Sequence, residues 1–385
     1  MTQAAAQDVR QHPGAVILKN SDQSLPASLP AIILELSSLH PIEFASGEAC
    51  SKTPPVRLDM NSSANVRRHF LASSTTALTA GGLVAGLASD KVQAAPTQLS
   101  PASDAQRVWP KFRYCLNTST INGGEVPVRE QVQIAAAAGY DAVELWLRDV
   151  TKYQQQGGSV ADLAKEMSDL GLGLDSAIAF GNWIADDPQQ REEGLAQCGR
   201  DMDLVRELGG RRIAAPPVGA TQAPTIELSA IAERYRRLLE VGLEREVEPQ
   251  VELWGFSHNL SALADVLYVA AAADRPNAGL LLDVYHLYKG GCDFTNVGFI
   301  PGTRLHCLHM NDYPADPPRS EISDAHRVYP GDGIAPISDL LSALVASGFS
   351  GTLSLELFNR EYWKLPALEV AKTGLEKMRR VSQSA

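Results

Sequence analysis

From residue 107 onward, short apolar runs alternate with longer stretches that have helical periodicity. Eight runs have the length and the branched or aromatic content of strands buried on both faces of a parallel sheet. They span residues 112–117, 142–147, 173–180, 211–217, 250–256, 279–286, 304–312 and 352–358. Amphipathic stretches separate them, and several of these end in glycine, as helices often do.

The connection around residues 290–300 is too short and irregular to predict a helix. Elsewhere strand and helix alternate regularly across residues 110–382, which predicts a single (β/α)8 TIM barrel. An open doubly wound sheet usually has fewer repeats and a glycine-rich phosphate-binding first turn. Neither a G-x-G-x-x-G nor a P-loop sequence is present. The α/β barrel is therefore the expected fold class.

The region before the barrel has a different pattern. Residues 1–59 contain scattered serine, proline and glutamine with one short apolar patch, so we expect a disordered extension or an artefact of start-site choice. Residues 95–109 read as a linker, and the barrel is expected to occupy residues 110–382.

Residues 60–94 contain a basic, an apolar and a small-residue region in the order that a signal peptide has. Arg67 and Arg68 precede Phe70 and Leu71, and a weakly apolar stretch with small residues near its end follows. The pattern Arg-Arg-x-Phe-Leu resembles the twin-arginine export signal. The apolar run is short and glycine-rich for a span of roughly 30 Å of hydrocarbon. We therefore expect a periplasmic or exported protein without a permanent membrane anchor.

Composition and charge narrow the classes of function. The 385 residues are 44% hydrophobic and 21% charged, as in an ordinary globular protein, and the net charge is -11. Phosphate binding needs a basic surface, so a nucleic-acid partner is not expected. The five cysteines form no C-x-x-C pair or zinc-ribbon spacing. The sequence leaves a homo-oligomer open.

Five predicted strands end in an acidic or imidazole side chain: Glu144, Glu252, Asp283, His309 and Glu356. In (β/α)8 barrels the chemistry lies at the C-terminal ends of the strands. Strands five to eight therefore aim three carboxylates and His309 at one point. Burying these carboxylates together is costly, and no lysine ends these strands to neutralise them. A single divalent cation, Mn2+, Mg2+, Co2+ or Zn2+, is the simplest partner for such ligands.

Each of these residues also has a structural alternative. Asp283 is followed three residues later by His286, and aspartate is a favoured residue for capping a helix. A lone Asp-x-x-His would fit a helix cap with a packed histidine as well as it fits a functional site. The other carboxylates, taken singly, would fit hydrogen-bonded polar groups of the core. The coincidence of four such strand ends favours the metal site.

The strand ends "VELW", "LLDVYH", "LHMND" and "LSLELF", with "RVYPGDG", resemble the xylose isomerase-like barrels. These include tagatose- and psicose-type ketose 3-epimerases, hydroxypyruvate isomerase, inosose dehydratase and endonuclease IV. The resemblance covers about residues 110 to 382. Endonuclease IV-like members use a larger metal cluster and a basic groove, whereas this domain is acidic, so DNA repair is not expected.

The resemblance implies roles for individual residues. Glu252, Asp283, His309 and Glu356 would bind one divalent metal ion, and the two glutamates would flank the substrate as the catalytic pair. His286, Arg327 and Glu144 would contact or orient the substrate. Trp254, near a predicted strand end, would form part of the apolar wall of a sugar pocket or belong to the core. Glu144 would alternatively form hydrogen bonds within the barrel. The long loop over residues 312–334 is expected to act as a lid, or to be only a surface excursion.

This constellation predicts a type of chemistry. A cation polarises a carbonyl, and a carboxylate removes the neighbouring proton to form an enediolate. Isomerisation, epimerisation and dehydration all begin this way, and the sequence leaves the three open. Export favours an unphosphorylated sugar, cyclitol or keto sugar acid as the substrate. The alternatives are an inosose dehydratase-like lyase and a non-catalytic periplasmic sugar-binding barrel.

Overall fold

The computed structural model describes residues 112–121, 125–222 and 224–383. The extension expected over residues 1–59, the signal peptide over 60–94 and the linker over 95–109 lie outside the described residues.

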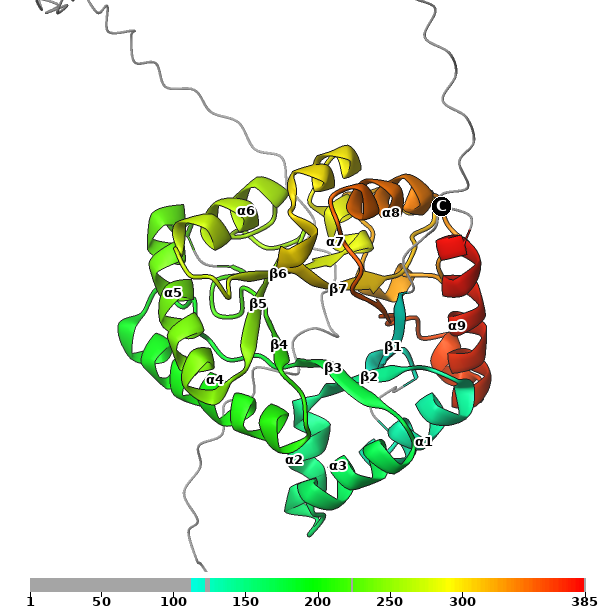
Figure 1. Cartoon of the computed structure of the whole chain (residues 1–385). Helices are drawn as coiled ribbons and strands as arrows, with labels where there is room; N and C mark the ends of the chain where they lie inside the picture. The colour runs from blue at the N-terminus through cyan, green and yellow to red at the C-terminus, as the bar shows by residue number, and fades with distance from the viewer. Residues whose placement is uncertain (1–111, 122–124, 223, 384–385) are drawn as a thin grey trace, which may run out of the picture. The chain divides into compact units, whose positions relative to one another are not determined.

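A parallel sheet of eight strands forms the centre of the molecule (Figure 1). The strands are β1 (Arg113–Asn117), β2 (Ala142–Trp146), β3 (Gly173–Ile178), β4 (Arg212–Ala215), β5 (Glu248–Glu252), β6 (Gly279–Asp283), β7 (Leu305–Met310) and β8 (Thr352–Leu355). Their hydrogen-bonded order is β3-β2-β1-β8-β7-β6-β5-β4. Since β3 and β4 also pack against each other, the sheet is a nearly closed barrel. The predicted (β/α)8 barrel is confirmed.

Helices form a ring outside the strands (Figure 1). They are α1 (Val128–Ala138), α2 (Leu147–Gln155), α3 (Val160–Asp169), α4 (Pro188–Glu207), α5 (Leu228–Arg245), α6 (Leu263–Ala272), α7 (Val284–Lys289), α8 (Ile337–Ala346) and α9 (Ala367–Gln383). Between β6 and β7 the chain forms the short α7 and then two 3₁₀ turns, Phe294–Phe299 and Gly302–Arg304. This irregular connection agrees with the sequence, which predicted no helix there.

Seven of the eight predicted strands were too long at their C-terminal ends, two of them at residues of the predicted site. The strand expected over residues 279–286 ends at Asp283, because the Asp283 Oδ1 accepts a hydrogen bond of 2.7 Å from the backbone N–H of His286 and caps α7. The last strand ends at Leu355, one residue before Glu356. The side chains at both positions still lie at the C-terminal edge of the sheet.

The apolar core has two parts. Most buried apolar side chains lie between the strands and the surrounding helices. A small second cluster, Trp146, Ile178, Ala214, Leu281 and Cys307, is separate from it. Polar side chains such as Gln250 and Ser354 are also fully buried on the strands. A polar site can therefore form on these strands without reaching the main core.

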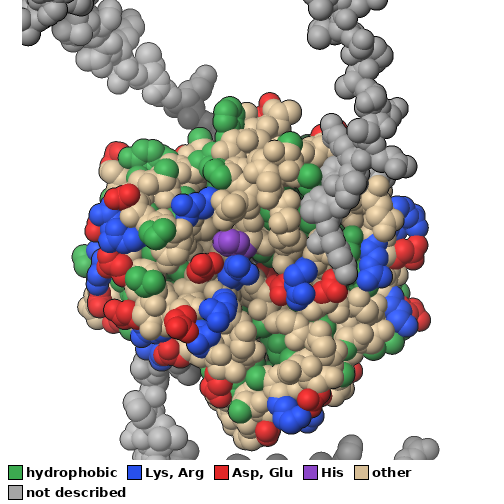
Figure 2. Space-filling view, in the orientation of Figure 1, with side chains coloured by type: hydrophobic (Ala, Val, Ile, Leu, Met, Phe, Trp, Pro, Cys, Tyr) green, Lys and Arg blue, Asp and Glu red, His purple; other side chains and the backbone are tan. Residues whose placement is uncertain are grey.

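Neither positive nor negative side chains dominate the face of the protein shown in Figure 2. Figure 2 shows acidic and basic side chains interspersed over that face. Within the described part of the chain, no helix is both long enough and apolar enough to cross a bilayer.

Candidate active site

The C-terminal edge of β5 to β8 brings together the four predicted metal ligands. Strand pairing aligns Asp283 with His309, and His309 with Ser354, two residues before Glu356. Glu252 ends the neighbouring β5. All four side chains are buried. Residues separated by more than a hundred positions in the chain thus form one enclosed polar site.

His309 lies at the centre of this site. Its Nδ1 is 3.1 Å from the Glu356 Oε2, 3.8 Å from the Asp283 Oδ2 and 3.9 Å from the Glu252 Oε1. None of these contacts has hydrogen-bond geometry, so a buried ring nitrogen faces three carboxylates without a directed partner. The ligand atoms of Asp283, His309 and Glu356 lie within 4.8 Å of one another. Glu252, the fourth predicted ligand, is not part of this group of three, although its Oε1 is 3.9 Å from the His309 Nδ1. This donor set fits a divalent cation.

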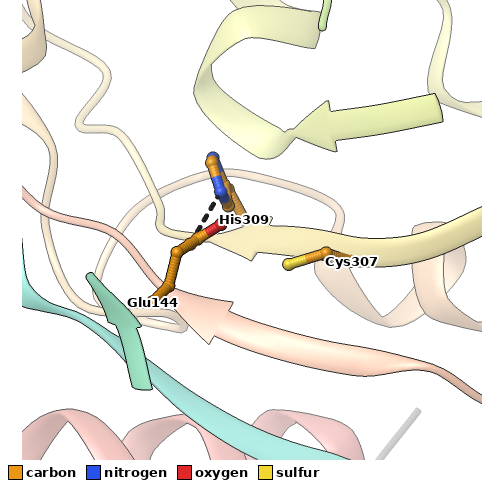
Figure 3. Close-up of side chains that lie close together, drawn as sticks. All are labelled: Glu144, Cys307 and His309. Carbon is orange, nitrogen blue, oxygen red and sulfur yellow. Dashed lines mark ion pairs between the residues drawn. The ribbon is translucent and has the colours of Figure 1, made fainter. Parts of the chain in front are cut away.

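The other ring nitrogen of His309 faces Glu144 (Figure 3). Its Nε2 lies 3.0 Å from the Glu144 Oε2, and the Cys307 thiol is nearby. The same Glu144 oxygen already accepts hydrogen bonds from the Asn117 Nδ2 (2.9 Å) and the Ser354 Oγ (2.8 Å). Burial raises the pKa of the Cys307 thiol well above its usual value, so the thiol keeps its proton. The carboxylate side of His309 is therefore the better cation site.

Arg327 places a positively charged guanidinium in the site, from the loop that follows β7. The side chain is fully buried, and its Nη1 donates to the Asp283 Oδ2 and the Glu356 Oε2, both at 2.8 Å. Its Nη2 donates to the Asp324 Oδ1 at 2.5 Å. Burial alone would lower the pKa of the guanidinium, but the three carboxylates raise it above its usual value. Arg327 therefore offsets part of the negative charge, which no strand-end lysine does.

Main-chain contacts hold this loop in place. The Asp312 carboxylate accepts four backbone N–H bonds of 2.8 to 3.0 Å, from Tyr313, Gly331, Gly333 and Ala335. A Cβ at Gly333 would lie 2.3 Å from the Asp312 Oδ1, so this position accepts only glycine. The Lys289 ammonium on α7 donates to three carbonyl oxygens of the same loop. The loop predicted as a lid is thus pinned to α7 and places Arg327 beside the carboxylates.

The two glutamates differ electrostatically. The pKa of Glu252 is raised to about 8, mainly by burial; His309 opposes this rise, and the nearby Glu356 contributes to it. Burial also raises the pKa of Glu356, but His309 and Arg327 outweigh burial and hold the value below the usual range. For His309, the adjacent Glu144 and Glu356 carboxylates outweigh burial and raise the pKa well above its usual value. Glu356 is thus a stable carboxylate, whereas Glu252 can hold a proton near neutral pH.

His286 lies beside this cluster as a neutral imidazole. Burial is the main cause that lowers its pKa to about 4. Its Nε2 lies 3.2 Å from the Arg327 Nη2, and a guanidinium can only donate, so Nε2 is the acceptor. The proton is then on Nδ1, which is buried without a partner. His286 therefore has a buried N–H donor without a hydrogen-bond partner among the described residues.

Aromatic rings line one side of the site. Trp146 lies against Phe180 and Phe358, with ring centroids 5.2 and 5.9 Å apart. Trp254 lies against Phe180 and against the His286 ring, at 6.3 and 6.2 Å. These rings form an aromatic cluster that contacts His286 and, through the Trp146 Nε1, Asn117.

Two buried asparagines also belong to the site, and the sequence reasoning missed them. The Asn117 Nδ2 donates to Glu356 as well as to Glu144. The Asn311 Nδ2 donates to the Asp283 Oδ2 at 2.8 Å. A signal for both was present, since Asn117 ends the first predicted strand and Asn311 follows His309 by two residues. Residues two apart on a strand share a face.

Comparison with known proteins gives relatives of several activities. The chain is 27% identical over 280 residues to inosose isomerase of Bacillus velezensis, a match that covers 69% of this chain and 95% of that protein. It is 28% identical over 256 residues to 3-dehydroshikimate dehydratase of Pseudomonas aeruginosa, covering 65% of this chain and only 39% of that longer protein. A fructoselysine 3-epimerase of Escherichia coli is 24% identical over 278 residues, covering 66% of this chain and 93% of that protein. The relatives are enzymes, both isomerases or epimerases and dehydratases.

Solved structures share the fold. The structure of an IOLI protein with a bound zinc atom has a TM-score of 0.67 and 23% identity, covering 71% of this chain and 99% of that one. An L-ribulose 3-epimerase structure has a TM-score of 0.58 and 19% identity, covering 71% of this chain and 95% of that one. The model of the xylose isomerase-like TIM barrel family matches residues 132–381. The chain belongs to the xylose isomerase-like TIM barrel family.

Proposed function

We propose that this chain is a metal-dependent isomerase or epimerase that moves a proton next to the carbonyl of a sugar, a cyclitol or a keto sugar acid. The observation that carries the proposal is the buried His309 nitrogen that faces three carboxylates without a directed partner. Glu252, Asp283, His309 and Glu356 would hold one divalent ion. The inosose isomerase and fructoselysine epimerase relatives support this class of substrate and reaction.

The residues of the site have distinct tasks in this proposal. When bound, the divalent cation polarises the substrate carbonyl and stabilises the negative charge that develops on its oxygen. Glu252 and Glu356 remove and return the proton, one from each side of the substrate. The His286 Nδ1–H donates to a substrate oxygen, and Arg327 holds Asp283 and Glu356 while facing the same substrate. Trp254 borders the substrate.

Glu144 takes the second of the two roles expected for it. Its Oε2 contacts His309 and accepts from Asn117 and Ser354, and the whole side chain is buried. This placement supports a role within the barrel, where the carboxylate orients the His309 ring from behind. The buried carboxylate partner of a metal-binding histidine usually has this function.

A lyase is the second candidate. Two relatives are 3-dehydroshikimate dehydratases, of Pseudomonas aeruginosa and Pseudomonas putida. Dehydration begins with the same proton removal and ends with loss of a hydroxyl group rather than return of the proton. The same site therefore supports both outcomes, and the position of the leaving hydroxyl in the substrate separates them.

The experiment is proton exchange in D2O. Metal-loaded protein is incubated with a panel of ketoses, inososes and keto sugar acids, and deuterium next to the carbonyl is followed by NMR. We expect incorporation with at least one compound, and none after chelation of the metal. Net loss of water from that compound would select the lyase. A ligand that binds but shows neither exchange nor elimination would favour a non-catalytic sugar-binding barrel.

We further propose twin-arginine export to the periplasm, on the basis of Arg67 and Arg68 followed by Phe70 and Leu71. Replacing both arginines by lysine in a reporter fusion is expected to keep the reporter in the cytoplasm. Export unchanged by this double substitution would contradict the proposal.

A further inference from the structure

Asn117, the last residue of β1, uses all of its side-chain hydrogen bonds in the polar site. The Nδ2 donates to the Glu144 Oε2 at 2.9 Å and to the Glu356 Oε1 at 3.0 Å. The Oδ1 accepts from the Trp146 Nε1 at 2.9 Å and from the backbone N–H of Ser119 at 3.1 Å. The side chain is fully buried, so water does not compete for these bonds.

These partners leave a single orientation for the amide. The indole and the backbone N–H can only donate, so they require the oxygen of Asn117, whereas the two carboxylates require its NH2 group. A flipped amide would lose all four bonds and place its oxygen against two carboxylates. Asn117 is therefore held from both sides.

The orientation of Asn117 separates the two oxygens of Glu356. The Oε1 is held by Asn117, while the Oε2 faces the His309 Nδ1 at 3.1 Å and the Arg327 Nη1 at 2.8 Å. The two oxygens of a carboxylate are equivalent, so Asn117 fixes the plane of the Glu356 carboxylate. Without Asn117, the bond from Arg327 to Oε2 remains to orient that plane. With Asn117, one oxygen of Glu356 is reserved for the cation site.

Asp283 is held in a different way. Its Oδ1 caps α7, and its Oδ2, the oxygen that faces the His309 Nδ1 at 3.8 Å, accepts from the Asn311 Nδ2 at 2.8 Å. Two ligands of the proposed cation thus each accept a hydrogen bond from a buried amide. Asn117 differs from Asn311 because its second N–H donates to Glu144, the carboxylate that contacts His309, and its oxygen accepts from the Trp146 indole.

We infer that Asn117 is a positioning residue that orients two parts of the cation site at once, Glu356 directly and His309 through Glu144. The inference rests on the proposed function, because it concerns the ligands assigned there. Removal of the amide is expected to weaken divalent-metal binding by about 10- to 100-fold, as is typical when a residue behind a metal ligand is lost. The same change is expected to release the Trp146 indole.

The test compares Asn117→Ala with Asn259→Ala in the full chain. Asn259 is a matched control because it is also buried and bonds Ile226, Ala220 and Pro224, away from the carboxylates. Dissociation constants for Mn2+ and Zn2+ are measured by chelator competition, at a temperature where circular dichroism shows both variants folded. We expect weaker binding only in Asn117→Ala. Equal constants for the wild type and Asn117→Ala, or equal losses in both variants, would overturn the inference.

Asn117→Asp provides the second variant, which keeps the shape and the acceptor oxygen but removes both donors. Its extra charge would by itself strengthen metal binding, so weaker binding would have to come from misplaced ligands. Weaker binding in Asn117→Asp supports the inference, and Asn117→Ala, which adds no charge, decides it.

The Trp146 indole proton gives a readout independent of metal. Its NMR signal, assigned with Trp146→Phe, is expected to move upfield in Asn117→Ala and to stay near its wild-type position in Asn117→Asp. A signal unmoved in Asn117→Ala would overturn the inference. A wild-type chain that binds no divalent metal would overturn the proposed function and this inference together, whereas metal binding that is normal in Asn117→Ala overturns the inference alone.

Discussion

The two ends of the barrel both carry clusters of charged side chains, but in different surroundings. At the N-terminal ends of the strands, Arg113 on β1 forms two bonds to Asp175 on β3, of 2.9 and 3.1 Å. Arg212 on β4 and His306 on β7 approach Glu248 on β5, both at 3.6 Å. The Arg113 side chain is 50% exposed and that of Arg212 34%. Acidic and basic groups there are matched, and water reaches them.

At the C-terminal ends the charges are buried and unbalanced. Glu144, Glu252, Asp283 and Glu356 are at most 5% exposed, and Arg327 is the arginine that contacts this group. Charge pairs in water contribute little to stability, whereas buried carboxylates without enough positive charge are costly. A fold gains nothing in stability from such a cluster. The difference indicates that the charges at the N-terminal end hold strands together, and it supports the proposal that the C-terminal end binds a cation.

The largest expected effect is loss of the metal. Asp283→Ala and His309→Ala each remove a ligand from a small donor set, so we expect purified protein to retain little or no divalent metal by elemental analysis. Asp175→Ala, at the opposite end of the barrel, is the control and is expected to keep wild-type occupancy. Full occupancy in both ligand variants would place the metal elsewhere.

The next effect concerns the two glutamates. Glu252→Gln and Glu356→Gln keep the size of the side chain but remove the base, and we expect turnover of a substrate found by D2O exchange to fall by about 10²- to 10⁴-fold. Glu248→Gln, four residues before Glu252 on the same strand, should leave turnover unchanged. Exchange that persists in both site variants would assign the base to another residue, with His286 the first candidate.

A smaller effect is the pH dependence of metal binding. The raised pKa of His309 keeps its ring protonated in the metal-free chain, and the pKa of Glu252, about 8, keeps that carboxyl protonated at neutral pH. Ligands must lose their protons to bind a metal, so affinity should rise with pH, by about tenfold per pH unit for each proton released.

Calorimetry in buffers of different protonation enthalpy counts the protons released. Glu252→Gln should release about one proton fewer than the wild type. An affinity that does not change between about pH 6 and pH 8 would contradict this coupling.

The smallest effect is expected at the N-terminal end of the barrel. Arg113→Ala removes a half-exposed ion pair, so we expect the free energy of unfolding in urea to fall by only about 0.5 to 1 kcal/mol. Metal content should not change. Lys165→Ala, which breaks the more exposed pair of Lys165 with Asp169, should cost still less. A loss of metal in Arg113→Ala would show that the two ends of the barrel are coupled.

The sequence by itself determined the barrel and the four proposed ligands. Buried parallel strands are continuous apolar runs, so eight of them can be counted without a structure. Their C-terminal ends meet at one edge, and for this reason Glu252, Asp283, His309 and Glu356 could be grouped in advance. The helix cap at Asp283 was also expected from the sequence, as an alternative to the metal site. The structure shows that one carboxylate caps α7 with one oxygen and faces His309 with the other.

Only the tertiary structure decided how these groups are held and which carboxylate faces which nitrogen. Glu144 was expected to end its strand but lies in the middle of β2, and it contacts the Nε2 of His309 rather than the Nδ1. In the sheet β2 is separated from β7 by β1 and β8. Arg327 comes from a loop whose path depends on backbone bonds to Asp312. Asn117 and Glu356 are 239 residues apart, and contacts of that kind form only when the barrel closes. Periodicity reports the neighbours of a residue along its own strand, whereas the partners that orient these ligands lie on other strands and loops.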